Sequence, residues 1–244
     1  MASLHTTAVV NNSLLHTMIM CNKKGGFTCG VEVNGVRLEE VQAFKYLGAT
    51  ISEQGSKPEI RNRIAQATAA IGKLQTIWKD KGITLRSKIR LMRSLVTSIF
   101  LYACESWTLN KELERKICAF EMRCFRRLLG ISYRDRVRNE EVENKIRQEI
   151  GPFEKTLTTI KKRKLKWFGH VTRGGGLAKI FLQGTVPGRR GRGRPKGTWG
   201  DNIKSWTGLS GAELVERTKD REKWRKLVHV ASTVPLRPIR LRDR

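Results

Sequence analysis

The chain has 244 residues, of which 39% are apolar, and it carries 49 Lys and Arg against 22 Asp and Glu, a formal net charge of +27. This length allows one large or two small domains around a modest core. So strong a positive charge favours nucleic acid over an anionic membrane as the partner, and no apolar run approaches the roughly 18 residues of a membrane span.

The positive charge is unevenly distributed along the chain. Residues 1–56 hold as many acidic as basic residues, so the whole excess lies in 57–244. The five Cys are an odd number in a Lys-rich chain, which indicates reduced thiols. The beginning of the chain lacks the pattern of a signal peptide. We therefore expect an intracellular protein, with the nucleus as the location.

The first quarter of the chain predicts a small β segment. Residues 1–16 are polar and unpatterned, and we expect them to be disordered. Residues 17–56 hold an apolar run at 17–21, two β-rich runs around Asn34-Gly35, and one strand at 43–52. Asn-Gly between β-rich runs is typical of a hairpin, because both residues tolerate positive φ. A mostly antiparallel sheet follows from this pattern.

From residue 57 the apolar spacing becomes helical, and a helical bundle is expected over 57–172. Thr84 and Asn110 are predicted to cap two of its helices. Another helix is expected at 139–150. Pro152 is predicted to lie in the first turn of the next helix, which Gly169 and then 174–176 should break.

The last part of the chain predicts a linker, short helices and a tail. Residues 173–197 read as a basic Gly/Arg linker. In the C-terminal helices, 198–230, Thr198 is expected to open one helix, and Ser210 with Glu213 has the form of a capping box for one more. Residues 231–244 should form a loose basic tail.

The most unusual stretch runs from Lys161 to Lys196, with twelve Lys or Arg and no Asp or Glu. A run of one sign repels itself unless a polyanion neutralises it, although a soluble basic linker is an alternative reading. Trp167 lies among the cations and suits base or sugar stacking, or else belongs to the core. The candidate nucleic-acid-binding residues are Lys161, Lys162, Arg163, Lys164, Lys166, His170, Arg189, Arg190, Arg192, Arg194 and Lys196.

Two parts of this stretch have specific interpretations. Lys161, Lys162 and Arg163 are expected on the polar face of a helix, with Lys164 directed inward by its stem. Arg192-Gly193-Arg194-Pro195 is similar to the core of an AT-hook, in which Arg side chains enter a narrow A·T minor groove. Plain phosphate contact is the alternative for this arm.

Catalytic and metal-binding patterns are not found in the sequence. Two-metal phosphoryl transfer needs clustered carboxylates, but no two of the five Asp are close in sequence. Cys104, Cys118 and Cys124 lack the spacing of a structural zinc site, so we expect buried structural thiols. His170 suits a helix end or a phosphate contact better than zinc. We therefore expect no catalytic residue, no metal and no cofactor.

Five segments resemble the C-terminal part of non-LTR (LINE-type) retrotransposon endonuclease–reverse transcriptases, a likeness that spans about residues 31–228. The segments are Phe44–Gly48 (FKYLG) with Ile51, Ser98–Trp107 (SIFLYACESW), Phe120–Leu129 (FEMRCFRRLL), Arg163–Val171 (RKLKWFGHV), and Arg192–Pro195 (RGRP) with Trp199. The resemblance implies the end of a polymerase palm, with Lys45, Tyr46, Leu47 and Gly48 at the palm–thumb junction. The following helices would be the thumb and a C-terminal region that holds template and primer.

The chain departs from that family in what precedes these segments. The catalytic Tyr/Phe-Ala-Asp-Asp sequence is absent, and the first sixteen residues do not resemble the family. The resemblance therefore implies a truncated product with an α+β fold: a small antiparallel palm remnant followed by a mainly helical thumb. It would bind DNA, RNA or their hybrid without polymerase activity of its own. The alternatives are one part of an active RNA-directed DNA polymerase, using Mg²⁺ on a palm from another chain, or a remnant with no function.

Overall fold

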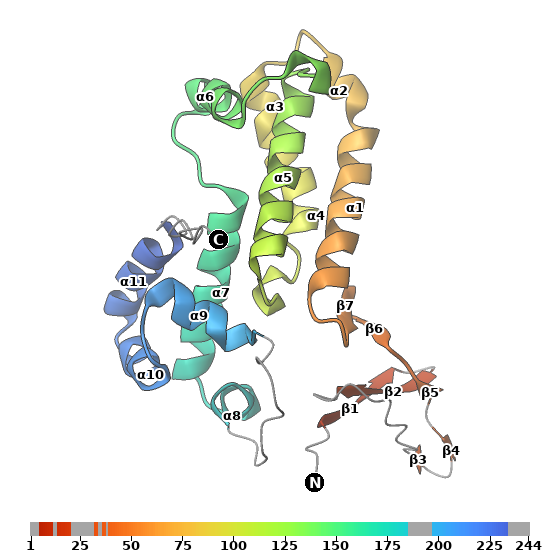
Figure 1. The fold of residues 1–244 in the computed structure, drawn as a ribbon, viewed down its shortest axis with the longest axis vertical. Coiled ribbons are helices and arrows are strands. Elements are labelled where there is room, and N and C mark those ends of the chain that lie inside the picture. The colour runs from red at the N-terminus through yellow and green to blue at the C-terminus, as the bar shows by residue number, and fades with distance from the viewer. Residues whose placement is uncertain are drawn as a thin grey trace, which may run out of the picture.

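The structure is a computed structural model that describes residues 41–184 and 197–233 and, before them, the backbone of five strands. The fold is α+β, as predicted, with short strands at one end of a mainly helical body (Figure 1). The strands are β1 (His5–Asn11), β2 (Leu14–Met20), β3 (Glu32–Val33), β4 (Val36–Arg37), β5 (Glu39–Glu40), β6 (Ala43–Tyr46) and β7 (Ala49–Ser52).

The first strands correct the expectation of a disordered N-terminus. β1 pairs antiparallel with β2, with Asn11 opposite Leu14, so regular structure begins at His5. Thr and Val are frequent in this segment, and such β-branched residues favour strands. β2 also pairs with β5, and this pair is parallel rather than antiparallel. The pairing of Val33 with Val36 confirms the predicted hairpin, although Asn34 and Gly35 themselves lie outside the described residues.

The single strand expected at 43–52 is wrong, because this segment is a second hairpin. β6 and β7 pair antiparallel, with Tyr46 opposite Ala49. Leu47 has φ +46° and Gly48 has φ +81°. Positive φ at both central residues is what a two-residue type I′ turn requires, and it lets the chain reverse within the predicted strand.

The helical body begins with a bundle that contains the larger core. Thr84 and Asn110 accept hydrogen bonds from the backbone N–H groups of Ser87 and Leu113, as predicted for N-caps. A π-helical segment, Met92–Thr97, continues directly from α3. The bundle consists of α1 (Lys57–Lys73), α2 (Gln75–Lys79), α3 (Leu85–Leu91), α4 (Ser98–Phe100), α5 (Lys111–Leu128), α6 (Asn139–Ile150) and the first half of α7 (Thr156–Arg173).

Helix α7 differs from its prediction at both ends. It begins at Thr156 and not near Pro152, because Glu121 of α5 accepts hydrogen bonds from the backbone N–H (2.8 Å) and hydroxyl (2.6 Å) of Thr156. Gly169 does not break the helix, which continues to Arg173. A Cβ at Gly169 would lie 2.1 Å from Nε1 of Trp224, so this glycine permits close packing of another helix.

The C-terminal helices form a second, smaller core around the last half of α7. They are α8 (Leu177–Gln183), α9 (Trp199–Thr207), α10 (Gly211–Lys219) and α11 (Arg221–Thr233). The helix start at Thr198 and the capping box at Ser210 are confirmed, and Thr198 also forms a capping box with Asp201.

Three predictions for this region are wrong. The expected linker at 173–197 contains helix α8. One helix was expected to run from Ser210 through Trp224 and Val228, but it ends at Lys219. Asp220 then caps α11 by accepting from the backbone N–H groups of Glu222 and Lys223. Finally, α11 extends through residues 231–233, which were assigned to the tail.

Candidate nucleic-acid interface

The basic run on α7 is divided between two faces of the helix. Ile160, Lys161, Lys164 and Leu165 are buried, while the solvent face carries residues three and four positions apart, which are neighbours on a helix surface. We call this solvent face the α7 stripe. It consists of Arg163, Lys166, Trp167 and His170, all exposed.

Lys164 is a structural residue and not a nucleic-acid contact. Its side chain is fully buried, and its Nζ donates to the carbonyl of Trp107 (2.6 Å) and to Oδ1 of Asn202 (2.7 Å). The Nζ also lies 4.6 Å from the ring centroid of Trp199. Burial lowers the pKa of Lys164 to about 7. We therefore remove Lys164 from the predicted interface, because a polyanion cannot reach it.

Lys161 and Lys162 are also engaged within the protein. Lys161 is 4% exposed, its Nζ lies 5.5 Å from the ring centroid of Trp206, and burial lowers its pKa. The prediction that Lys161 lies on the polar face is therefore wrong. Lys162 is half-buried and pairs with Glu154. Of the six α7 residues predicted to bind nucleic acid, only Arg163, Lys166 and His170 are exposed.

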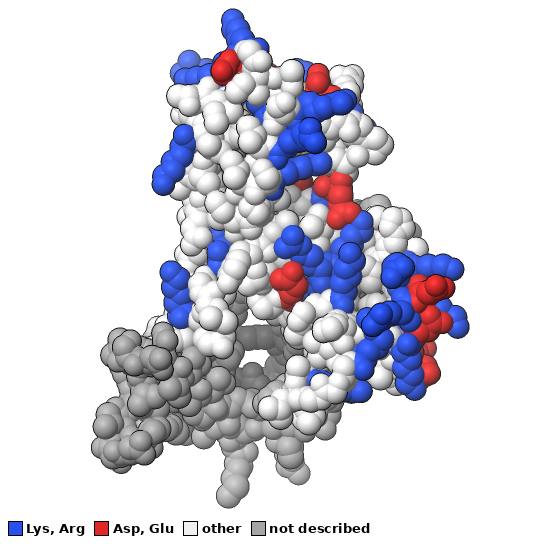
Figure 2. All heavy atoms as spheres, turned by 180° about the vertical axis from the view of Figure 1, so that it is seen from behind, with Lys and Arg blue, Asp and Glu red and all other residues white. Residues whose placement is uncertain are grey.

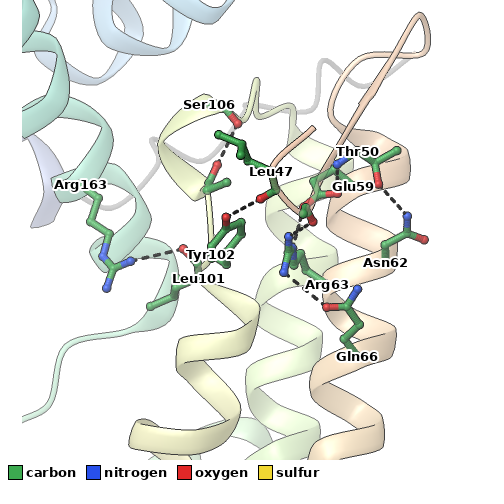
Figure 3. Close-up of polar contacts among 12 residues, drawn as sticks. Leu47, Thr50, Glu59, Asn62, Arg63, Gln66, Leu101, Tyr102, Ser106 and Arg163 are labelled. Atoms are coloured by element: carbon green, nitrogen blue, oxygen red, sulfur yellow. Dashed lines mark hydrogen bonds and ion pairs between the residues drawn. The ribbon is translucent and has the colours of Figure 1, made fainter. Parts of the chain in front are cut away.

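Arg163 joins the stripe to the segment that follows α4. Its Nη1 donates to the carbonyl of Leu101 (3.3 Å, Figure 3). The same Nη1 lies 3.9 Å from a carboxylate oxygen of Glu105. The Arg163 side chain still keeps 45% of its surface exposed. Its guanidinium is thus held in position and remains accessible to an anion.

Trp167 is 40% exposed, which favours a surface position over the alternative of a core residue. Its ring makes an edge-to-face contact with Trp199, with centroids 5.3 Å apart. Trp199 is itself fixed, since its Nε1 donates to the carbonyl of Glu105 (2.8 Å) and its ring stacks on Phe168. The orientation of Trp167 is therefore set by a neighbour that cannot easily move.

The basic arm lies beyond what the structure describes. Arg189, Arg190, Arg192, Arg194 and Lys196 all fall outside the described residues, so the groove-binding and phosphate-contact readings both remain predictions.

On the face opposite that of Figure 1, Lys and Arg side chains spread over the helices with fewer acidic side chains among them (Figure 2).

The turn of the β6–β7 hairpin, assigned to a palm–thumb junction, is fixed to the helical bundle. The hydroxyl of Tyr102 donates to the carbonyl of Leu47 (2.5 Å), and Nη2 of Arg63 donates to the carbonyl of Gly48 (2.5 Å), as Figure 3 shows. The Arg63 guanidinium also lies 4.4 Å from the Tyr102 ring centroid. Tyr46 and Leu47 themselves are exposed, and so is Lys45.

A buried ion pair supports the same hairpin from α1. Glu59 and Arg63 lie four residues apart on α1, and their side chains meet at 2.6 Å while both are buried. Glu59 also accepts the backbone N–H of Thr50 at 2.7 Å. Together these contacts hold the hairpin against α1.

Sequence reasoning missed Glu59, Arg63, Tyr102 and Asn202. Asn202 accepts from the backbone N–H of Leu109 and donates to its carbonyl, both at 2.7 Å, which joins α9 to the loop before α5. Glu59 and Arg63 have the spacing of a helical ion pair, which the sequence does show. The hairpin partners of this pair and the loop partner of Asn202 are distant in sequence and leave no local signal.

The thiols partly follow their prediction. Cys104 and Cys124 are buried, and burial raises the pKa of each to about 12. Cys118 is exposed, so its assignment as a buried thiol is wrong.

Within residues 41–184 and 197–233 and the five early strands, no three His, Cys, Asp or Glu side chains gather as metal ligands would. No helix in the same part of the chain is long and apolar enough to cross a membrane.

The chain is similar to an uncharacterized transposon-derived protein of Caenorhabditis elegans. The two are 31% identical over 139 residues, which is 56% of this chain and 49% of the relative. The chain thus spans about half the length of that relative. No family model matches the chain, and no solved structure matches it. The likeness indicates a transposable-element origin and does not specify the kind of element.

Proposed function

We propose that this chain is the palm-end, thumb and C-terminal part of a LINE-type reverse transcriptase, and that it binds DNA, RNA or their hybrid without polymerase activity of its own. The observation that carries the proposal is the α7 stripe, whose three titratable side chains, Arg163, Lys166 and His170, are all basic. A polyanion is the ligand that such a surface attracts. A nuclear location belongs to the same proposal, because chromosomal DNA is the target of a retroelement.

The likeness to a transposon-derived protein supports a mobile-element origin for this function. The segments that resemble reverse transcriptases include Arg163–Val171, and this segment carries the α7 stripe. Two residues within it, Lys164 and Gly169, serve packing instead. The basic residues Arg163, Lys166 and His170 of this motif stay exposed, although Arg163 is also held by Leu101 and Glu105.

The proposal predicts binding that depends strongly on salt. If about six to ten phosphates are contacted, the affinity for a labelled duplex or hybrid should fall roughly 10³- to 10⁵-fold between about 50 and 200 mM salt. Fluorescence anisotropy over a salt series measures this slope. No binding at low salt, or an affinity that salt does not change, would contradict the proposal.

A double variant tests whether the α7 stripe is the interface. Arg163→Ala with Lys166→Ala should weaken binding to every sequence and lower the salt slope by about two. The matched control is Lys219→Ala with Lys223→Ala, which removes two exposed cations that pair with Glu216 of α10 and with Asp220 before α11. Equal losses in the two variants would show that only net charge matters and that the α7 stripe is not a site.

The alternative, part of an active polymerase completed by another chain, is favoured by the exposed side chains of the hairpin. Tyr46 is 48% exposed, Leu47 75% and Ile51 39%, although hydrogen bonds fix their backbone. Such an apolar surface suits a further palm segment. Primer extension with Mg²⁺, with and without a co-expressed upstream palm, separates the two functions, because only the alternative predicts extension with the palm present.

A further inference from the structure

Trp167 differs from the other exposed aromatic residues that the structure describes, of which Tyr46 is the last residue of the short strand β6. The ring of Tyr102 is covered by Arg63, and its hydroxyl is bonded to the hairpin. Tyr133 is 97% exposed and lies on a short 3₁₀ turn. Trp167 lies on the long helix α7, and its ring makes an edge-to-face contact with the ring of Trp199. It is 40% exposed.

Basic side chains of the α7 stripe lie on both sides of this ring along the helix. Arg163 precedes Trp167 by four residues and His170 follows it by three, so both are its neighbours on the helix surface. Arg163 and His170 are seven positions apart, which corresponds to about 10 Å along the helix axis. This length suits the backbone of about two nucleotides, with a base between their phosphates.

We propose that Trp167 is a stacking platform for an unpaired nucleotide base, with Arg163 and His170 holding the phosphates on either side. This inference rests on the proposed function and specifies its ligand. In a duplex each base face is covered by the next base pair, so an aromatic ring has no face to stack on. The stripe therefore selects single-stranded DNA or RNA over continuous duplex.

Binding of matched ligands tests this preference. Fluorescence anisotropy would compare a labelled oligothymidylate, the corresponding RNA, and a closed dumbbell duplex that has no open ends. Trp167→Leu keeps apolar volume against Trp199 but removes the aromatic face. We expect this variant to lose roughly 5- to 150-fold in affinity for both single strands. Its affinity for the dumbbell should stay within about twofold, since phosphate contacts are unchanged.

Two further variants control for the chemistry of the ring. Trp167→Phe retains an aromatic face and should lose less single-strand affinity than Trp167→Leu. Tyr133→Leu removes an aromatic residue that is more exposed than Trp167 and does not belong to α7. This variant should change neither the single-strand affinity nor the dumbbell affinity. Circular dichroism and a thermal melt show whether each variant is folded before its binding is compared.

Tryptophan fluorescence gives a second readout that does not depend on affinity. Trp78, Trp107 and Trp224 are buried, so a base that stacks on Trp167 should quench the most accessible indole. The quenching by oligothymidylate should be largely lost in Trp167→Phe.

Three results would overturn the inference. Trp167→Leu could leave single-strand binding unchanged, it could weaken single-strand and dumbbell binding equally, or oligothymidylate could leave the fluorescence unchanged while it binds. If the unmodified chain bound neither ligand at low salt, the proposed function would fail as well.

Discussion

The inner and outer faces of α7 use the same residue type for opposite purposes. Lys164 and Lys166 are two positions apart, yet the first is fully buried with two carbonyl acceptors and the second is exposed. The inner lysine joins the helix to the loop before α5 and to α9, while the outer one contributes to the α7 stripe. A run of positive charge in a sequence therefore does not by itself define an interface. Because successive side chains of a helix point in different directions, some lysines of the run are buried in the core.

The largest expected effect comes from breaking the inner face. Lys164→Ala removes a donor from the carbonyl of Trp107 and leaves a space beneath Trp199 and Trp206. The free energy of unfolding should fall by about 2–5 kcal/mol, from an unsatisfied acceptor and a cavity. Chemical denaturation measures this loss. A change below about 0.5 kcal/mol would show that Lys164 does not hold the two cores together.

Close packing on the same face predicts the next largest effect. Gly169→Ala would place a Cβ 2.1 Å from Nε1 of Trp224, whose indole is buried and donates to the carbonyl of Leu165. Overpacking of this kind should cost about 1–3 kcal/mol of unfolding free energy. Gly72→Ala on α1 is the control, because nothing lies within 4 Å of its Cβ. That change should be neutral or stabilise by up to about 1 kcal/mol.

The pH dependence of stability sharpens the same contrast. Burial lowers the pKa of Lys164 to about 7, while an unfolded lysine titrates near 10.4. Between these values the unfolded chain binds more protons at this position, so the contribution of Lys164 to the free energy of unfolding rises with pH. The slope is at most about 1.4 kcal/mol per pH unit.

Comparison with Lys164→Met isolates this contribution, because other titrating groups cancel in the difference. Denaturation of both proteins from about pH 7 to 10 should show the unmodified chain gaining stability relative to the variant. A difference that stays constant over this range would mean that Lys164 remains charged inside the fold.

The smallest effect on stability is expected on the outer face. Lys166→Ala should change the free energy of unfolding by less than about 0.5 kcal/mol, since exposed side chains contribute little. In nucleic-acid binding the order reverses. Lys166→Ala should lower the salt slope by about one, whereas Lys164→Met should leave the slope of the folded protein unchanged. A reduced slope in Lys164→Met would place this lysine in the interface after all.

The sequence by itself determined the fold class and the limits of many helices, because these depend on local patterns. The hairpin around Asn34-Gly35, the caps at Thr84, Asn110, Thr198 and Ser210, and the helix at 139–150 all follow from residues a few positions apart. The charge excess and the position of the basic run were also visible without a structure. Local patterns gave a wrong prediction where the same residues fit either a strand or a turn. Leu47 and Gly48 form a turn inside the segment that was predicted to be one strand.

Only the tertiary structure decided which members of the basic run face solvent and where α7 begins. Glu121 caps α7 from 35 residues away, Asn202 accepts from Lys164 across 38 residues, and Trp224 requires a glycine at position 169. Each of these contacts joins segments that carry no sequence signal of their meeting. Burial and hydrogen bonding depend on contacts between residues that are distant in the sequence. These contacts bury Lys161 and Lys164 inside the protein, whereas Arg163, Lys166, Trp167 and His170 lie on the surface.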